Sequence, residues 1–166
     1  MRDAFRLILS IAFALALNAQ ESVKTSGNLK ASACGPVVHH STKRVAGASP
    51  LEANPPSDEA LVYVVRPTVF GSWDQSKLSI DRKWVGVNQY KTYFVVAVAP
   101  GAHDLCSQIE NASRLTVTLE AGKTYYFQQH IYAGAWRAQN ELSQLTEAEG
   151  RAALKKCKRM IFWEKQ

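Results

Sequence analysis

Two runs of β-like sequence each contain a glycine turn: Val96-Ala97-Val98-Ala99-Pro100-Gly101-Ala102-His103 and Val117-Thr118-Leu119-Glu120-Ala121-Gly122-Lys123-Thr124-Tyr125-Tyr126. At such turns proline presets φ and glycine permits a positive φ, so the chain folds back on itself. Both runs belong to a series of short apolar segments from Ala60 to Tyr132. About seven short strands at this spacing are typical of an antiparallel β-sandwich rather than a βαβ sheet. The predicted fold class is therefore all-β.

Local signals place individual elements within this fold. The run Ala60-Leu61-Val62-Tyr63-Val64-Val65-Arg66 is apolar on both faces, which predicts a central strand. Residues 81–83 are polar and separate two apolar runs, which predicts a hairpin. Thr146 and Glu149 have the spacing of a capping box and predict one C-terminal helix. Gly150 weakens that helix by about 1 kcal/mol relative to alanine, so docking on the sandwich has to stabilise it.

The N-terminus has the three parts of a secretory signal. Arg2 and Arg6 precede an apolar stretch from Leu7 to Leu17, and the small residue Ala19 follows. The apolar stretch has about 11 residues, roughly half the length that an α-helix needs to span a membrane. We therefore predict a cleaved signal peptide over residues 1–19 and an exported protein, periplasmic or secreted and associated with the cell envelope.

The next segment differs in composition from the rest of the chain. Residues 20–58 are rich in Ser, Ala, Gly, Asn, Pro and Lys and have no sustained apolar period. Such a sequence cannot bury enough apolar surface to offset its ordering entropy. We expect a flexible, disordered tether over 20–58, followed by one β-sandwich domain with its helix over 59–166.

Four strand and turn motifs follow one another along the chain: Ala60-Leu61-Val62-Tyr63-Val64-Val65-Arg66-Pro67, Ile80-Asp81-Arg82-Lys83-Trp84-Val85-Gly86, Val98-Ala99-Pro100-Gly101-Ala102-His103 and Leu119-Glu120-Ala121-Gly122-Lys123-Thr124-Tyr125-Tyr126-Phe127. In this order they resemble the motifs of a bacterial family known as domain of unknown function 2846, over roughly residues 58–155. This resemblance implies an exported bacterial β-sandwich with no established activity, and it carries over no site residues.

Three cysteines raise the question of a disulfide. Cys106 and Cys157 lie in the expected domain, whereas Cys34 lies in the expected tether. Because exported proteins form disulfides, we predict a bridge between Cys106 and Cys157 that pins the C-terminal helix to a strand. Two buried free thiols are the alternative, since connectivity cannot be deduced from sequence.

The reactive side chains form no recognisable constellation. A metal site needs three or four converging ligands. His39 and His40 are neighbours in the expected tether, and His103 and His130 are typical of residues on sandwich strands. No acid pair and no Ser-His-Asp order emerges from the sequence either. We predict no metal, no cofactor and no catalytic residues, and the sequence leaves open whether the protein is an enzyme.

A net charge of +6 permits weak attraction to anionic lipid head groups or wall polymers, and the export signal argues against nucleic acid as a ligand.

Near the C-terminus, a basic cluster directly precedes four bulky apolar residues. This segment could lie at a membrane surface, with the basic residues on anionic head groups and the aromatic residues at the acyl boundary. We favour the other interpretation, in which the apolar residues pack on the sandwich as a last strand or turn, because their exposure would promote aggregation. The candidate membrane or partner contacts are Lys155, Lys156, Lys158, Arg159, Phe162 and Trp163.

Three functional hypotheses follow from these features. The leading one is a non-catalytic, exported cell-envelope module that binds or scaffolds an unknown envelope component. The second is a small envelope hydrolase whose site assembles from distant loops. The third is a peripheral membrane protein anchored by its basic, aromatic C-terminal segment. An enzyme should have a pocket with convergent polar groups, whereas a module should have a flat face or an exposed sheet edge.

Overall fold

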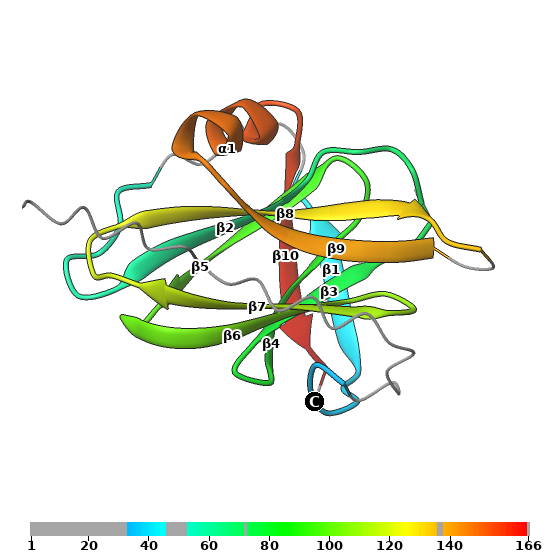
Figure 1. The fold of residues 1–166 in the computed structure, drawn as a ribbon, viewed down its shortest axis with the longest axis horizontal. Helices are drawn as coiled ribbons and strands as arrows, with labels where there is room; N and C mark the ends of the chain where they lie inside the picture. Colours follow the sequence, from blue (N-terminus) through cyan, green and yellow to red (C-terminus); the bar gives the residue numbers. More distant parts are fainter. Residues whose placement is uncertain (1–32, 46–52, 72, 136–137, 166) are drawn as a thin grey trace, which may run out of the picture.

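The computed structural model describes residues 33–45, 53–71, 73–135 and 138–165. The predicted signal peptide lies outside these residues. Two β-sheets pack face to face, and a short helix lies over the larger sheet (Figure 1). The elements in chain order are β1(His40–Arg44), β2(Ala60–Arg66), β3(Ser76–Ile80), β4(Lys83–Asn88), β5(Thr92–Val98), β6(Gly101–Gln108), β7(Ala112–Leu119), β8(Thr124–Ala133), β9(Ala138–Leu145), α1(Glu147–Leu154) and β10(Lys158–Glu164).

The sheet topology confirms the predicted β-sandwich. The larger sheet has the order β1-β10-β5-β2-β8-β9 and the smaller one the order β4-β3-β6-β7. The structure differs from the expectation in two respects. The described residues form ten strands, and two pairs, β2 with β8 and β5 with β10, are parallel. A parallel pair needs a long crossover connection, so no turn signal in the sequence indicates it.

Strand β2 is the central strand that its apolar sequence predicts, and all seven of its residues are buried. It pairs with β5 on one side and with β8 on the other. Val62 and Val64 point into the core between the sheets. Leu61, Tyr63 and Val65 belong instead to a second apolar cluster, which includes residues of α1. The helix therefore explains why a strand in this sandwich is apolar on both faces.

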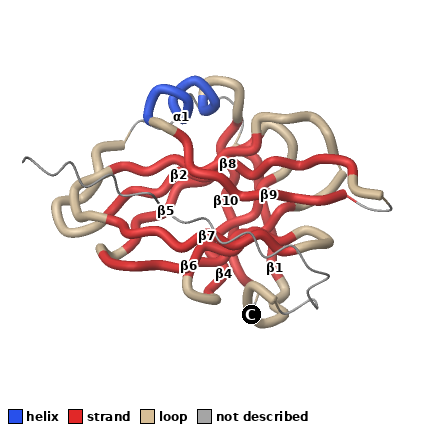
Figure 2. Tube along the Cα trace, viewed as in Figure 1, coloured by secondary structure: helices blue, strands red, loops and turns tan. Residues whose placement is uncertain are grey.

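Helix α1 begins with the predicted capping box. The main-chain N–H of Thr146 donates to the Glu149 carboxylate at 2.9 Å, and the Thr146 side chain accepts from the N–H of Glu149. Ala153 and Leu154 are buried in the cluster that contains Tyr126 of β8. Figure 2 shows α1 beside strands β2 and β8. Docking on the larger sheet thus stabilises a helix that has only eight residues.

Gly150 is the position where α1 approaches the sheet most closely. A Cβ at this residue would lie 2.2 Å from Cγ of Tyr126. We therefore expect Gly150→Ala to lower the free energy of unfolding by about 1–3 kcal/mol, because the clash outweighs the better helix propensity of alanine. Urea denaturation measures this change, and Ala152→Gly, at an exposed position of α1, measures the propensity effect alone. A Gly150→Ala variant more stable than the wild type would contradict the close approach.

The expectation of a flexible tether over 20–58 needs correction. Residues 40–44 form β1, which pairs antiparallel with β10 along its whole length, from His40 opposite Glu164 to Arg44 opposite Met160. The ordered domain therefore includes residues before 59. The physical reason is that β1 is stabilised by pairing with a strand from the other end of the chain, which the local composition does not show.

The C-terminal segment forms the predicted last strand, β10, but only two of its four bulky apolar residues pack on the sandwich as expected. Its first two residues pair in parallel with β5, and the rest of the strand pairs with β1. Met160 is buried and Phe162 is half-buried, whereas Ile161 and Trp163 remain about half exposed. The two sets alternate because successive side chains of a strand point to opposite faces.

Candidate functional site

The segment 33–38, here called the strap, lies on the outer face of the smaller sheet. Three side chains of that sheet bind its main-chain carbonyls. The Trp84 indole N–H donates to the carbonyl of Pro36 at 2.7 Å, the Ser79 hydroxyl to that of Cys34, and the Arg114 guanidinium to that of Ala33. Because β3, β4, β6 and β7 are paired in register, these side chains converge on one face.

A disulfide fixes the strap covalently. Cys34 is bonded to Cys106 of β6, so the predicted bridge between Cys106 and Cys157 is wrong. Cys106 points to the outer face of the smaller sheet, whereas Cys157 lies in the cluster beneath α1 on the larger sheet. Cys157 is a buried free thiol, and burial raises its pKa to about 11. Its thiol is therefore protonated and unreactive at neutral pH.

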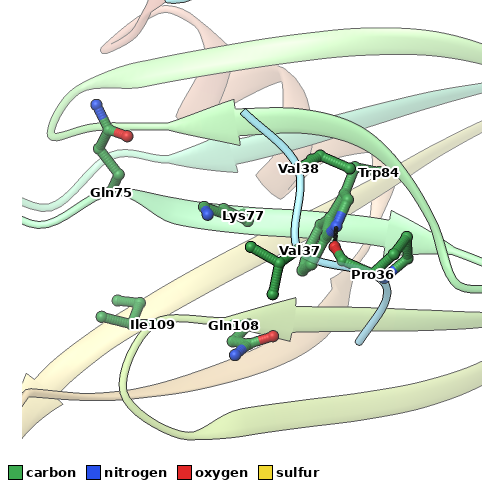
Figure 3. Close-up of a pocket in the computed structure, with 8 residues that line it drawn as sticks. All are labelled: Pro36, Val37, Val38, Gln75, Lys77, Trp84, Gln108 and Ile109. Atoms are coloured by element: carbon green, nitrogen blue, oxygen red, sulfur yellow. Dashed lines mark hydrogen bonds between the residues drawn. The ribbon is translucent and has the colours of Figure 1, made fainter. Parts of the chain in front are cut away.

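Beside the strap lies a cavity of about 240 Å³, here called the strap groove. Figure 3 shows the strap forming one wall and β3 the floor, with the end of β6 opposite. The ammonium of Lys77 lies 5.8 Å from the centre of the Trp84 ring. The groove is lined by Pro36, Val37, Val38, Gln75, Lys77, Trp84, Gln108 and Ile109.

The lining of the strap groove combines one positive charge with polar and apolar groups. Lys77 is the only charged residue among those that line it, and Gln75 and Gln108 add two amides. Val37, which is 78% exposed, and Ile109 add apolar surface. A lysine next to amides and apolar surface can bind a carboxylate or phosphate on a partly apolar ligand. The lining contains no carboxylate and no histidine that could transfer a proton.

The pairing of Asp81 with His103 has the appearance of a catalytic dyad but a structural role. Nδ1 of His103 lies 2.6 Å from the Asp81 carboxylate, and Nε2 lies 2.8 Å from the carbonyl oxygen of Ala99. The main-chain N–H of Asp104 and then His103 bind the carboxylate and lower the pKa of Asp81. Both ring nitrogens are therefore engaged, and neither is free to activate a nucleophile.

The remaining histidines also have local partners or lie apart. Nε2 of His40 is 3.2 Å from the Gln75 side chain, and Nδ1 of His130 is 3.0 Å from that of Gln128. His39 is exposed on the segment that leads into β1. Within the part of the chain that the structure describes, no three His, Cys, Asp or Glu side chains are grouped so that they could hold a metal ion.

The structure separates the six predicted contact residues of the C-terminal segment. Lys155 and Lys156 are exposed directly after α1, and Lys158 is exposed at the start of β10. Phe162 packs towards the smaller sheet, with its ring 5.8 Å from that of His40. Arg159 and Trp163 alternate with it and so occupy the opposite face of β10.

No helix among the described residues has both the length and the apolar character needed to span a membrane.

Sequence reasoning missed the residues of the strap groove. Gln75 and Lys77 lie more than 30 residues before Gln108 in the sequence, and only the register that pairs Lys77 with Gln108 brings them together. The strap that completes the groove comes from more than 30 residues upstream, in a segment whose sequence has no sustained apolar period and suggests no structure. A pairing of Cys34 with Cys106 was the one signal that could have placed it.

Comparison with known proteins gives the family of the chain and no activity. The family described as "Protein of unknown function (DUF2846)" matches residues 56–141, which include β2 to β8 and the first half of β9. An uncharacterized protein of Haemophilus influenzae is 27% identical over 104 residues, and the match spans 62% of this chain and 62% of that protein. No solved structure matches the chain. The chain belongs to the DUF2846 family, as its strand and turn motifs predicted.

Proposed function

We propose that this protein is a non-catalytic, exported module of the bacterial cell envelope that binds an anionic envelope polymer in the strap groove. The observation that carries the proposal is the groove itself, in which Lys77 lies among amides and apolar side chains beside a covalently fixed wall. A wall polymer of sugars and peptides offers matching groups. Its carboxylates suit Lys77, its amides suit the two glutamines, and the apolar faces of its sugars suit Val37 and Ile109.

The disulfide supports the exported location. Disulfides form and persist in oxidising compartments and are rare in the cytosol. Cys34 and Cys106 are bonded here, and the first residues of the sequence have the charge and apolar pattern of a secretory signal. We therefore place the protein in the periplasm or at the cell surface, where wall polymers are abundant anions.

The arrangement of polar groups supports binding rather than catalysis. The groove offers an amine and two amides, which bind anions and hydrogen-bonding groups but do not transfer protons readily at neutral pH. The Asp81 and His103 pair lies outside the groove lining, and its two ring nitrogens are already engaged. A fixed groove without a base or nucleophile is the expected design of a recognition module.

Sedimentation with insoluble bacterial peptidoglycan tests the proposal. We expect the wild-type protein to sediment with the polymer, and Lys77→Glu to weaken that binding about tenfold, because it replaces an attractive charge with a repulsive one. The matched control is Lys83→Glu, the same charge reversal at an exposed position of β4 outside the groove. Failure of the wild type to sediment at low salt would overturn the proposal. So would an equal loss in both variants, since that would indicate unspecific attraction.

A further inference from the structure

The connection between β2 and β3, here called the 67–75 loop, exposes three apolar side chains among its described residues, 67–71 and 73–75. Val69 is 55% exposed, Phe70 is 51% exposed and Trp73 is 97% exposed. A tryptophan that projects almost wholly into solvent contributes nothing to the core of the domain. Such a cluster on a soluble domain marks an interaction site or an aggregation hazard.

A buried arginine holds this loop in place. Arg66, at the end of β2, is fully buried. Its guanidinium donates to the main-chain carbonyls of Asp74 at 2.7 Å, Phe70 at 3.1 Å and Gly71. Burial lowers the pKa of Arg66, whereas the charge of Asp74 raises it. Burying a cation is costly unless it is well hydrogen-bonded. The hydrogen bonds that Arg66 donates offset part of this cost and at the same time fix the main chain of the loop.

The tight turn of the loop depends on Gly71. Its φ is +65°, and a Cβ there would lie 2.8 Å from the Asp74 carboxylate and 3.0 Å from Ile131 of β8. The main-chain N–H of Asp74 donates to the carbonyl of Gly71 at 2.9 Å and closes the turn. Phe70 and Trp73 therefore project from a loop that is packed against the sandwich at its base.

Other apolar and basic side chains gather at the same end of the sandwich. Arg66 pairs with Thr92, so the loop lies beside the turn between β4 and β5. Tyr132, 47% exposed, follows Ile131 at the end of β8. Figure 1 shows the β2–β3 connection, the β4–β5 turn and the β8–β9 hairpin at one end, on the right of the view.

Three cations lie around the β4–β5 turn. Lys91 is exposed in the turn, and its carbonyl accepts from the main-chain N–H of exposed Lys158 at 2.9 Å. The Arg44 guanidinium lies 4.7 Å from the centre of the Tyr90 ring. Two carboxylates at this end carry the opposite charge. Asp74 is half-buried beside Arg66, and Glu110 lies in the turn after β6. The exposed ends of the lysines thus give this end a basic rim next to its apolar loop.

We propose that this end of the sandwich docks on an anionic lipid surface, with Phe70 and Trp73 inserted at the level of the head groups and Lys91 and Lys158 against the phosphates. Because Trp73 is 97% exposed, its side chain lies in no groove of the domain, and a deformable lipid interface can surround it. Aromatic side chains favour the membrane interface, and nearby lysines strengthen the attraction to anionic lipid. The inference goes beyond the proposed polymer binding, since it uses a different surface.

Sedimentation with lipid vesicles tests this inference on the full mature chain. We expect the wild type to bind vesicles of phosphatidylethanolamine with phosphatidylglycerol, more weakly as salt increases, and to bind phosphatidylcholine vesicles poorly. The double variant Phe70→Ala, Trp73→Ala should bind the anionic vesicles at least about tenfold more weakly, because it removes the inserted apolar surface. Lys91→Ala with Lys158→Ala should reduce both the affinity and its salt dependence.

The matched control is the double variant Ile161→Ala, Trp163→Ala, which removes a similar exposed pair from β10. It should bind the vesicles as the wild type does. Trp73→Ala alone keeps the test valid if the loop double variant fails to fold, because that side chain is almost fully exposed. Three results would overturn the inference: a wild type that stays in solution with every vesicle, equal losses in the two double variants, or a loss confined to the β10 variant. The last result would assign the contact to the C-terminal strand.

Discussion

Replacing both Cys34 and Cys106 by alanine is expected to lower the free energy of unfolding by about 4 kcal/mol. The bridge joins residues 72 positions apart, so its loss returns a large amount of conformational entropy to the unfolded chain. In the folded protein, the strap would then depend on its hydrogen bonds to Ser79, Trp84 and Arg114 and on its packing against the sheet. Urea denaturation of the wild type and the double variant, both without reductant, measures the loss.

Cys157→Ala is the control that separates the observed bridge from the one that the sequence suggested. A count of one free thiol in the denatured wild type fits either pairing. In Cys157→Ala, the bond between Cys34 and Cys106 leaves no free thiol, whereas a bond between Cys106 and Cys157 would leave two. Two free thiols in this variant, or full stability in the double variant, would contradict the covalent strap.

The same bond links stability to the proposed binding site. Val37 and Val38 of the strap form one wall of the strap groove, and Cys34 is the covalent anchor next to them. Reductant should therefore weaken binding to peptidoglycan in the wild type and leave vesicle binding by the 67–75 loop unchanged. The two surfaces differ in this respect because Arg66, and no disulfide, holds that loop.

Elements with local signals could be predicted from the sequence. The hairpin between β3 and β4 turns at Asp81 and Arg82, which both adopt positive φ. The helix starts at Thr146 with its capping box. In both cases, residues within four positions of one another determine the structure. The apolar sequence of β2 similarly predicted its central place, because burial on both faces is a property of the strand itself.

Elements that depend on distant partners could not be predicted in this way. The polar sequence of β1 becomes a strand only because β10 pairs with it. The strap is ordered by contacts with the outer face of the smaller sheet, and none of these lies nearby in sequence. Gly150 is another case in which a distant residue, and not the local sequence, explains the structure. Its sequence context suggests a weak point of the helix, whereas the structure shows that Tyr126 requires a glycine there.

The interior also contains polar residues that the strand pattern does not reveal. Ser76, Asn88, Thr92, Ser107 and Gln129 are all fully buried. In an alternating strand, such residues are normally expected on the solvent side. Here they form one hydrogen-bonded network at the end of the core that carries the 67–75 loop, because the strands that carry them meet there.

Gln129 is the centre of this network. Its carbonyl oxygen accepts from Ser76 at 3.1 Å and from Asn88 at 3.0 Å. Its amide nitrogen donates to the Ser107 hydroxyl at 2.9 Å and approaches the carbonyl of Lys77 at 3.4 Å. Asn88 in turn donates to the carbonyl of Val64 at 3.1 Å. One amide from the larger sheet therefore connects three strands of the smaller one.

Replacing Gln129 by leucine is expected to lower the free energy of unfolding by about 3 kcal/mol, although leucine has a similar size and is apolar. The substitution removes the acceptor of the Ser76 hydroxyl, one acceptor of the Asn88 amide and the donor to the Ser107 hydroxyl. Because all three side chains are buried, water does not replace these hydrogen bonds. The free energy comes from urea denaturation. Gln144→Leu, at an exposed position of β9, is the matched control and should change stability by about 0.5 kcal/mol or less.

A double-mutant cycle with Ser107→Ala distinguishes the network from a general packing effect. Each single variant leaves the other side chain with an unsatisfied buried group, so the two losses should add up to more than the loss in the double variant. Additive losses would mean that Gln129 and Ser107 act independently. A Gln129→Leu variant as stable as Gln144→Leu would show that the buried amide contributes nothing to joining the two sheets, and it would remove the reason for its burial beneath the 67–75 loop.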